Sequence, residues 1–342
     1  MSTAPNPGRI VEVGLGFWPA QALLTAVDQG VFTLLARSAL TGEQIRASLG
    51  WQPRGVHDLL DGLVALRFLE RDGNGPAARY RNTADAAAFL DKQSPSYLGG
   101  ILEMANARLY RYWGELGEAM RTGKPQNEIK HSGESIFAEL YKDPAKLEQF
   151  LSAMVGLSTP NFEKLARSFD FSRYRTLCDV GGATGQLSLC VARRHAHLCC
   201  TSFDLPAVEP IAKRWIARAG LADRVQTASG DFFEDPLPRA DVITMGMILH
   251  DWNLERKMQL VRAAFAALPS GGAFIVIEAL IDDERRENVM GLMMSLNMLI
   301  EFGDAFDYTG ADFTRWCLEA GFRRTEVLKL EGPSSAAIAY KE

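Results

Sequence analysis

Residues 175–185, Arg-Thr-Leu-Cys-Asp-Val-Gly-Gly-Ala-Thr-Gly, join a short apolar run to a turn with three glycines. The apolar run up to Val180 predicts a buried strand. Gly181, Gly182 and Gly185 then predict a turn whose backbone can come close to a ligand, because glycine has no side chain. Residues 186–194 predict the next helix, so the turn lies at the carboxyl end of a parallel strand, where open α/β sheets bind ligands.

An acid stands at the spacing expected for a nucleoside site. Asp204, followed by Leu205, ends a second apolar strand and lies 19 residues beyond Gly185. An acid about twenty residues past a glycine turn is placed to bind the two hydroxyls of a ribose. The G-G-x-x-G spacing, and a turn without Arg or Lys, weaken the interpretation as a dinucleotide site. A turn whose glycines serve only packing remains the alternative.

The second half of the chain alternates between strand and helix patterns. From residue 176 onward, this order predicts a doubly wound, mostly parallel sheet. Two late strands, 325–330 and 336–340, are separated by a segment too short for a parallel crossover. The sheet is therefore predicted to end in an antiparallel hairpin.

The first part of the chain predicts a winged-helix-like domain. Residues 42–49 and 54–69 read as two helices, 71–76 as a turn and 78–81 as a strand. Residues 1–100 carry nine basic and nine acidic side chains, so the electrostatic driving force for DNA binding would be small. We therefore expect a dimerisation or lid domain at 1–95, and we expect the apolar residues around Trp18, Leu23 and Phe32 to form a subunit contact.

Residues 96–170 are predicted to be a mostly helical connector before a final domain at 171–342. Its expected helices cover 97–121, 134–142 and 144–168. The last has apolar residues at helical spacing, a stripe that more often packs in a core than contacts a ligand. In the alternative interpretation Phe150 and Met154 would be pocket walls.

Composition limits the class of protein. The chain has 342 residues and a net charge of -5, which argues against nucleic acid or an anionic membrane as the main partner. Its five cysteines are scattered through apparent helices and strands, as expected for buried thiols in a reducing compartment. The first residues do not resemble a signal peptide, and we expect no apolar run of about 18 residues. The predicted location is the cytoplasm.

Candidate chemical groups follow three further strands. Asp231 and Phe232 follow the third strand and could meet an adenine ring, although Asp231 could also be a solvated loop acid. His250 follows the fourth strand, where a histidine could accept the proton of a phenol or cap a helix. Glu278 ends an apolar strand and is expected to contact His250 or to be exposed. Several carboxylates at one edge suit a cationic cofactor such as a sulfonium.

Together these motifs resemble the plant-type small-molecule O-methyltransferases, the family of the caffeic acid and acetylserotonin enzymes. The resemblance covers nearly the whole chain. Its signals are Asp179-Val180-Gly181-Gly182-Ala183-Thr184-Gly185, Phe203-Asp204-Leu205-Pro206, Gly230-Asp231-Phe232-Phe233 and Leu249-His250-Asp251-Trp252. Two later motifs, Ala267-Leu268-Pro269-Ser270-Gly271-Gly272 and Glu319-Ala320-Gly321-Phe322, also match.

The resemblance implies an α/β fold with a Rossmann-like class I methyltransferase domain, S-adenosyl-L-methionine as cofactor, metal-free methyl transfer and a homodimer. His250 would be the general base, Glu278 its orienting partner and Asp307 the second acid, where the family usually has a Glu; whether the shorter side chain reaches the imidazole stays open. The implied cofactor residues are Ser158, Asp179, Gly181, Gly182, Asp204, Leu205, Asp231, Phe232 and Trp252. The implied acceptor site contains Phe150, Met154, Met247, Asn297, Met298 and Phe302. A Lys-Trp pair common before the histidine in plant members is Gly246-Met247 here.

We therefore predict methylation of a phenolic hydroxyl on a small aromatic metabolite. C-methylation ortho to a phenolate is a close alternative in the same fold. An NAD-dependent oxidoreductase is disfavoured by the glycine spacing, and a ligand-sensing DNA-binding regulator by the neutral winged helix. The sequence does not name the acceptor, because apolar pocket walls discriminate by only about 1 to 3 kcal/mol per methylene.

Overall fold

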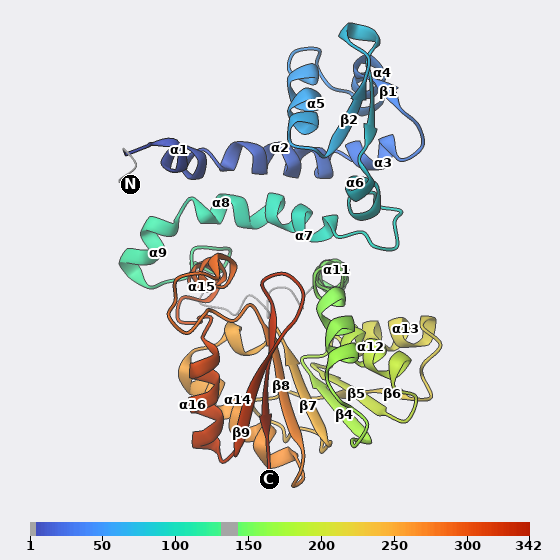
Figure 1. Cartoon of the computed structure of the whole chain (residues 1–342). Coiled ribbons are helices and arrows are strands. Elements are labelled where there is room, and N and C mark those ends of the chain that lie inside the picture. The colour runs from blue at the N-terminus through green and yellow to red at the C-terminus, as the bar shows by residue number, and fades with distance from the viewer. Residues whose placement is uncertain (1–4, 131–142) are drawn as a thin grey trace. The chain divides into compact units, whose positions relative to one another are not determined.

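The computed structural model describes residues 5–130 and 143–342, in two compact units, Met1–Arg111 and Tyr112–Glu342 (Figure 1). The predicted helix at 134–142 lies outside the described residues. The unit boundary falls inside the predicted connector, so the division at 95 and 170 stays an interpretation.

The first unit combines helices with a small antiparallel sheet of order β1-β3-β2. Its helices are α1 (Gly8–Gly14), α2 (Phe17–Asp28), α3 (Val31–Leu35), α4 (Gly42–Leu49), α5 (Val56–Ala65), η1 (Gly75–Ala77), α6 (Ala84–Phe89), α7 (Gly99–Met104) and the π-helix η2 (Ala105–Leu109). Its strands are β1 (Leu40–Thr41), β2 (Leu69–Asp72) and β3 (Arg79–Asn82). The order of two helices and a hairpin is the predicted winged-helix pattern.

The second helix of that pattern is shorter than predicted. Arg67 adopts the left-handed conformation at φ 65°, and the N–H of Phe68 donates to the carbonyl oxygen of Leu63. This closes α5 in the manner of a helix C-cap. Residues 66–69 therefore do not continue the helix, and Arg71 and Asp72 lie in β2 rather than in a turn.

The core of the first unit contains one residue that we expected at a subunit contact. Phe32 is completely buried with Ile45, Leu60 and Leu63, so that expectation is wrong for Phe32. Trp18 instead has 61% of its surface exposed, and other apolar side chains of α1 and α2 are also exposed. Residues Gly8–Asp28 are long and apolar enough to cross a membrane by length and composition, contrary to the expected lack of such a run.

The second unit is a seven-stranded sheet with flanking helices. Its helices are α9 (Leu116–Thr122), α11 (Pro144–Ser168), α12 (Gln186–Arg194), α13 (Glu209–Arg218), η3 (Leu249–Asp251), α14 (Leu254–Ala267), α15 (Val289–Phe302) and α16 (Gly310–Ala320), while α8 (Tyr110–Trp113) crosses the boundary between the units. Its strands are β4 (Thr176–Val180), β5 (Cys199–Asp204), β6 (Val225–Ser229), β7 (Val242–Gly246), β8 (Ala273–Glu278), β9 (Arg324–Lys329) and β10 (Ser335–Tyr340). The helix predicted at 97–121 is divided between α7, η2, α8 and α9, with a turn at Gly114, because glycine weakens a helix interior.

The sheet has the order β6-β5-β4-β7-β8-β10-β9. The five strands from β4 to β8 pair in parallel, whereas β10 pairs antiparallel with both β8 and β9. The predicted parallel sheet and terminal hairpin are therefore confirmed. The carboxyl ends of β4, β5, β6, β7 and β8 meet at one edge, because parallel strands point the same way.

Successive side chains of the strands enter two hydrophobic clusters, one on each face of the sheet. Cys178, Ile243 and Phe274 pack with residues of α14 and α16, such as Val261 and Phe313. Their neighbours in sequence pack on the other face with α11, α12 and α13. A strand buried on both faces must be apolar almost throughout, which explains the apolar runs in the sequence.

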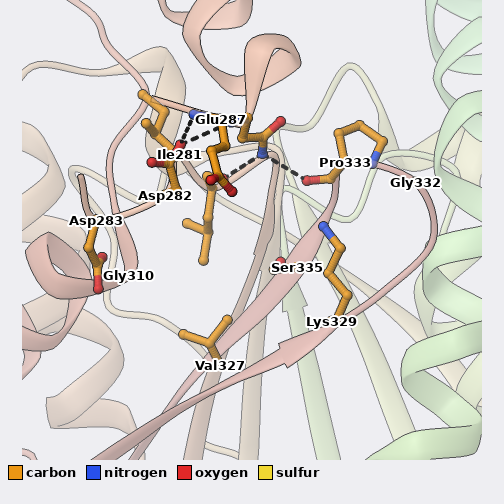
Figure 2. Close-up of a pocket in the computed structure, with 12 residues that line it drawn as sticks. Ile281, Asp282, Asp283, Glu287, Gly310, Val327, Lys329, Gly332, Pro333 and Ser335 are labelled. Carbon is orange, nitrogen blue, oxygen red and sulfur yellow. Dashed lines mark hydrogen bonds between the residues drawn. The ribbon is translucent and has the colours of Figure 1, made fainter. Parts of the chain in front are cut away.

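A hollow of about 550 Å³ lies beside the β9–β10 turn (Figure 2). Asp282 accepts backbone N–H bonds from Arg286, Glu287 and Asn288 there. The amide of Asn288 donates to the carbonyl oxygens of Leu280 and Pro333 and so ties the loop before α15 to the hairpin. None of the described residues that line this hollow is a predicted site residue.

Candidate active site

The glycine turn follows β4 with an unusual backbone. Gly181 and Gly185 have φ values of 70° and 80°, and Ala183 also has a positive φ of 51°. A Cβ atom on Gly182 would lie 2.3 Å from the Oγ of Ser202 and 3.0 Å from the carbonyl oxygen of Asp179. Gly182 is therefore required by the packing of the turn itself, which supports the packing alternative at this position.

Two carboxylates hold the turn. Asp204 accepts the N–H of Ala183 at 2.8 Å and that of Leu205 at 2.7 Å, and burial raises its pKa to about 6. Asp179 is buried and accepts the hydroxyl of Thr244 at 2.7 Å. Burial raises the pKa of Asp179 to about 7. The structure therefore brings both predicted acids to the glycine turn, where Asp179 is buried and Asp204 is partly buried.

The other predicted cofactor residues lie on three elements. Asp231 follows β6 and accepts the N–H of Phe233 at 2.9 Å, while the ring of Phe232 stands edge-on to Trp252 with centroids 6.0 Å apart. Ser158 is half-buried on α11. The pattern of residues fits S-adenosyl-L-methionine. The glycines of the turn have no side chains, so their backbone can lie close to the cofactor. Asp204 can accept hydrogen bonds from the ribose hydroxyls, and Phe232 offers an apolar surface for the adenine ring.

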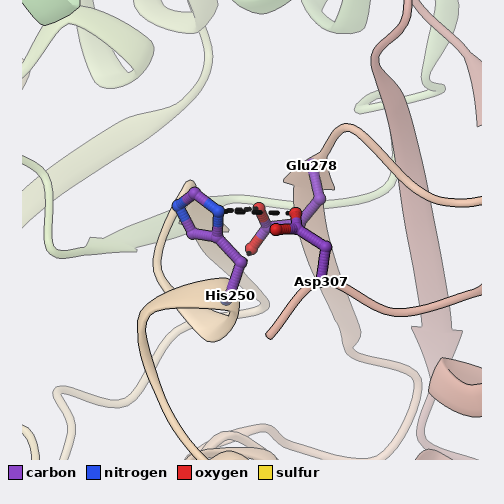
Figure 3. A group of neighbouring side chains, drawn as sticks. All are labelled: His250, Glu278 and Asp307. Carbon is purple, nitrogen blue, oxygen red and sulfur yellow. Dashed lines mark hydrogen bonds and ion pairs between the residues drawn. The ribbon is translucent and has the colours of Figure 1, made fainter. Parts of the chain in front are cut away.

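His250 lies beside two buried acids, Glu278 and Asp307 (Figure 3). Its Nδ1 is 3.4 Å from Oδ1 of Asp307 and 3.9 Å from Oε2 of Glu278. An oxygen of Glu278 also lies 3.4 Å from the backbone nitrogen of His250. Asp307 therefore reaches the imidazole in spite of its shorter side chain, and Glu278 is buried rather than exposed.

The neighbouring acids determine the pKa of the His250 imidazole. Burial lowers the pKa of His250, but the charges of Glu278, Asp251 and Asp307 outweigh it and raise the pKa to about 10. Burial raises the pKa of Glu278 to about 7 and that of Asp251 to about 6. An imidazole in this position is a strong proton acceptor once it is neutral.

The predicted acceptor residues are distributed over β7, α11 and α15. Met247 follows β7 at φ 57°, and the amide of Asn297 accepts the indole N–H of Trp113 at 3.0 Å. Helix α15, which carries Asn297, Met298 and Phe302, packs against η3. Met154 is half-buried on α11.

Phe150 differs from the others. It packs beside Leu147, Leu151, Val208 and Trp215, a cluster between α11 and α13. These apolar neighbours support the interpretation that Phe150 packs in a core. Leu157, in the same apolar stripe of α11, is instead 42% exposed. A pocket role for Phe150 stays a prediction.

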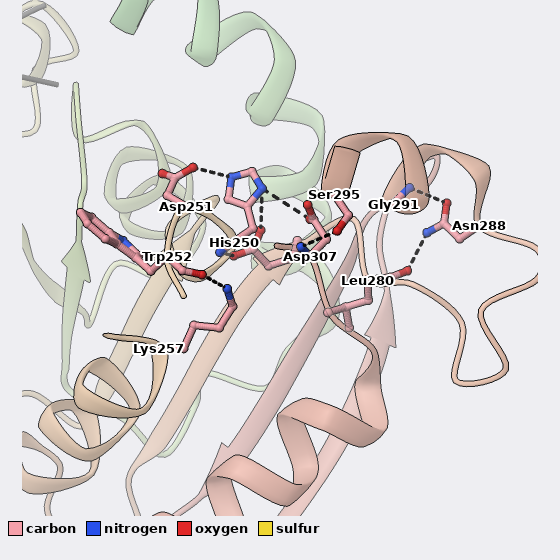
Figure 4. Close-up of polar contacts among 10 residues, drawn as sticks. His250, Asp251, Trp252, Lys257, Leu280, Asn288, Gly291, Ser295 and Asp307 are labelled. Atoms are coloured by element: carbon pink, nitrogen blue, oxygen red, sulfur yellow. Dashed lines mark hydrogen bonds and ion pairs between the residues drawn. The ribbon is translucent and has the colours of Figure 1, made fainter. Parts of the chain in front are cut away.

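Sequence reasoning missed two charged residues of the site (Figure 4). Asp251 lies 3.3 Å from Nε2 of His250, and the side chain of Lys257 on α14 is completely buried. The sequence could have revealed the burial of Lys257. This residue shares the apolar face of α14 with Leu260, Val261 and Ala264, at the spacing of one helical stripe.

Comparison with known proteins identifies the family of this chain. The O-methyltransferase domain family matches residues 113–323, and the O-methyltransferase dimerisation domain family matches residues 11–92. The tetracenomycin polyketide synthesis 8-O-methyl transferase of Streptomyces glaucescens is 39% identical over 98% of this chain and 97% of its own length.

Solved structures show the same fold. Human N-acetylserotonin methyltransferase, solved in complex with S-adenosylmethionine, is 29% identical with a TM-score of 0.90, covering 100% of this chain and 99% of that one. An O-methyltransferase from neocarzinostatin biosynthesis was solved with S-adenosylmethionine and 2-hydroxy-5-methyl naphthoic acid. It is 27% identical with a TM-score of 0.76, covering 94% of this chain and 96% of that one. The chain therefore belongs to the O-methyltransferase family with an N-terminal dimerisation domain, and is an S-adenosyl-L-methionine-dependent O-methyltransferase of small aromatic metabolites.

Proposed function

We propose that the enzyme methylates a phenolic hydroxyl of a fused-ring aromatic metabolite, with His250 as the general base. The observation that supports this most is the buried contact of His250 with Asp307 and Glu278 at the sheet edge that also carries the glycine turn. The names of two similar proteins, which concern a tetracenomycin polyketide and a naphthoic acid, favour a fused-ring acceptor.

The two acids on Nδ1 give the imidazole its orientation. They favour a proton on Nδ1. The acceptor hydroxyl would take the place of Asp251, whose Oδ1 lies 3.3 Å from Nε2, and Nε2 would accept its proton. The cofactor supplies an electrophilic methyl group on a sulfonium. As the phenolic oxygen takes that methyl group, Nε2 takes its proton, and the imidazolium is stabilised by Asp307 and Glu278.

Proton transfer is energetically close to balanced in this arrangement. An ordinary phenol has a pKa of about 10, and the acids raise the pKa of His250 to about 10. The remaining rate enhancement must come from holding the two reactants in line, for which intramolecular models allow about 7 to 11 kcal/mol.

We also propose the residues that would hold the two ligands. For the cofactor we propose Ser158, Asp179, Gly181, Gly182, Asp204, Leu205, Asp231, Phe232 and Trp252. For the acceptor we propose Met154, Met247, Asn297, Met298 and Phe302, with Phe150 as a less central wall.

Assembly and location complete the proposal. The dimerisation domain and its exposed apolar side chains support a homodimer. The five cysteines are free thiols and four of them are buried, which suits the reducing cytoplasm.

The proposal is tested by incubating the protein with S-adenosyl-L-methionine and a set of hydroxylated naphthoic acids and polycyclic phenols, with EDTA present throughout. We expect a new methoxy group in the product, identified by NMR, and a rate lowered about 10²- to 10⁴-fold in His250→Ala. A methyl group on ring carbon, dependence on added metal or a wild-type rate in the variant would contradict it.

A further inference from the structure

Lys257 is a buried cation in a protein core. Its side chain is completely buried, and its Nζ donates to the carbonyl oxygen of Trp252 (Figure 4). The same nitrogen lies 3.8 Å from the ring centroid of Phe306 and 5.8 Å from that of Tyr308. Lysine is almost never completely buried without partners, so this position calls for a specific role.

The charged groups around Lys257 are those around His250. Asp251 on η3, Glu278 on β8, and Asp304 and Asp307 on the segment after α15 all attract its ammonium group. Three of these, Asp251, Glu278 and Asp307, also attract the imidazolium of His250. The further ionisable neighbours are Glu301 on α15, whose charge acts on Asp251, and Tyr308, which is affected by Glu278 and Asp307.

These acids create a problem for a general base. A protonated imidazole cannot accept a proton, and three neighbouring carboxylates favour the protonated form. Below the pKa of the base, each unit by which that pKa falls increases the neutral fraction about tenfold. A positive charge beside the acids lowers the pKa of the imidazole, because it repels the imidazolium and partly neutralises the negative charge of the carboxylates.

We propose that Lys257 is a positioning residue that shares the negative charge of Asp251, Glu278 and Asp307 with His250, and so increases the fraction of His250 available as a base. Its bond to Trp252 fixes the turn that carries His250. The inference rests on the proposed role of His250. Burial lowers the pKa of Lys257 to about 8 against the attraction of the acids, so the side chain remains mostly charged at neutral pH.

The test separates the charge of Lys257 from its hydrogen bond. Lys257→Gln removes the charge but keeps an N–H donor for Trp252, whereas Lys257→Arg keeps both. NMR of the full-length protein with labelled histidine gives the pKa of His250 directly, with its signal assigned by its loss in His250→Gln. Because Lys257 loses its proton near pH 8, before His250 titrates, we expect Lys257→Gln to leave this pKa near the wild-type value and Lys257→Arg, which stays charged, to lower it by about one unit.

Single-turnover methyl transfer gives the second readout. In Lys257→Gln the rate should be lower below about pH 8, where wild-type Lys257 is charged. The rate should fall about tenfold at neutral pH and approach the wild-type rate at high pH, where wild-type Lys257 also becomes neutral.

Lys341 provides a matched control. Its Nζ donates to the carbonyl oxygens of Phe265 and Leu268 at 2.7 Å each and lies 4.3 Å from the ring centroid of Phe265. It follows β10 near the start of β8, at the opposite sheet edge from Glu278. Lys341→Gln should lower stability without moving the pKa of His250.

Three outcomes would overturn the inference: an unchanged pKa of His250 in Lys257→Arg, an equal loss of rate at every pH in Lys257→Gln, or an equal loss of rate at neutral pH in Lys341→Gln. If Lys257→Gln does not fold, the NMR titration of the charged Lys257→Arg variant still tests the inference. Failure of the proposed function is recognised separately, by a wild-type rate in His250→Ala, because the NMR titration does not depend on activity.

Discussion

The Oδ1 atom of Asp307 lies closer to Nδ1 of His250, at 3.4 Å, than does the nearest carboxylate oxygen of Glu278, at 3.9 Å. The shorter acid therefore makes the closer contact, although the longer one also approaches the backbone nitrogen of His250. The segment after α15 compensates for the missing methylene by bringing the backbone of Asp307 to the site, where its N–H donates to Ser295 at 3.2 Å.

At high pH, where His250 is already neutral, Asp307→Asn should lower the rate of methyl transfer at least as much as Glu278→Gln, since the closer anion stabilises the imidazolium more strongly. Each variant should also lower the pKa of His250, because it removes an attracting negative charge, and should move the acidic limb of the pH profile to lower pH. Single-turnover rates from pH 6 to 10 check both effects. A much smaller loss in Asp307→Asn would assign the orienting role to Glu278 alone.

Stability should depend on pH through His250. Its folded-state pKa, raised to about 10, lies above the ordinary value of 6.5, so the stabilisation is fully present below pH 6.5 and is lost as pH rises through 10. Thermal unfolding of the wild type should therefore occur at progressively lower temperature between pH 7 and 10, and His250→Ala should show a smaller decrease.

His197→Ala is the control for this titration, because His197 is exposed and its ring contacts the carbonyl oxygen of Phe171 and the ring of His195. Its unfolding temperature should decrease with pH as in the wild type. Parallel curves for the wild type and His250→Ala would contradict the raised pKa.

Asp204→Asn should weaken the binding of S-adenosyl-L-methionine while keeping one oxygen for the turn. Hydrogen bonds to a charged acceptor contribute about 1.5 to 3 kcal/mol each, so the dissociation constant should rise more than tenfold. Alanine is a poorer choice, because Asp204 also accepts the N–H groups of Ala183 and Leu205. Titration calorimetry measures the change, with the exposed Asp223→Asn as control; equal affinities in all three proteins would remove Asp204 from the cofactor site.

The sequence predicted the sheet and its edge well because each depends on local patterns. Apolar runs, the glycine turn and the acid nineteen residues past Gly185 are all visible along the chain. Contacts between distant segments were not predictable in this way. The reach of Asp307 depends on the path of the chain after α15, and the contact of Lys257 with Phe306 joins residues 49 positions apart.

Local exceptions also escaped the patterns. The α5 helix ends early because Arg67 takes a left-handed conformation that its residue type does not favour. Phe32 and Trp18 belong to one apolar stretch, yet the first is in the core and the second is exposed. The spacing of apolar residues predicts that a helix forms, but it does not show which face of the helix packs against the rest of the unit.

Trp18→Glu should convert the proposed homodimer into monomers. Trp18 is 61% exposed, and Ile10 and Val13 on α1 are 76% and 62% exposed, so a partner that covers these side chains would bury a continuous apolar area. A carboxylate at position 18 would then be desolvated on association, which is costly without a partner charge. Leu318→Glu on α16 is the matched control, because Leu318 is 50% exposed in the methyltransferase unit. Light scattering coupled to size exclusion should give a dimer for the wild type and the control, and a monomer for Trp18→Glu.

Because Gly8–Asp28 also has the length and composition of a membrane span, flotation with lipid vesicles is the parallel assay. A wild-type protein that floats with vesicles, or a Trp18→Glu variant that remains dimeric, would show that this apolar surface has a different partner from a second copy of the chain.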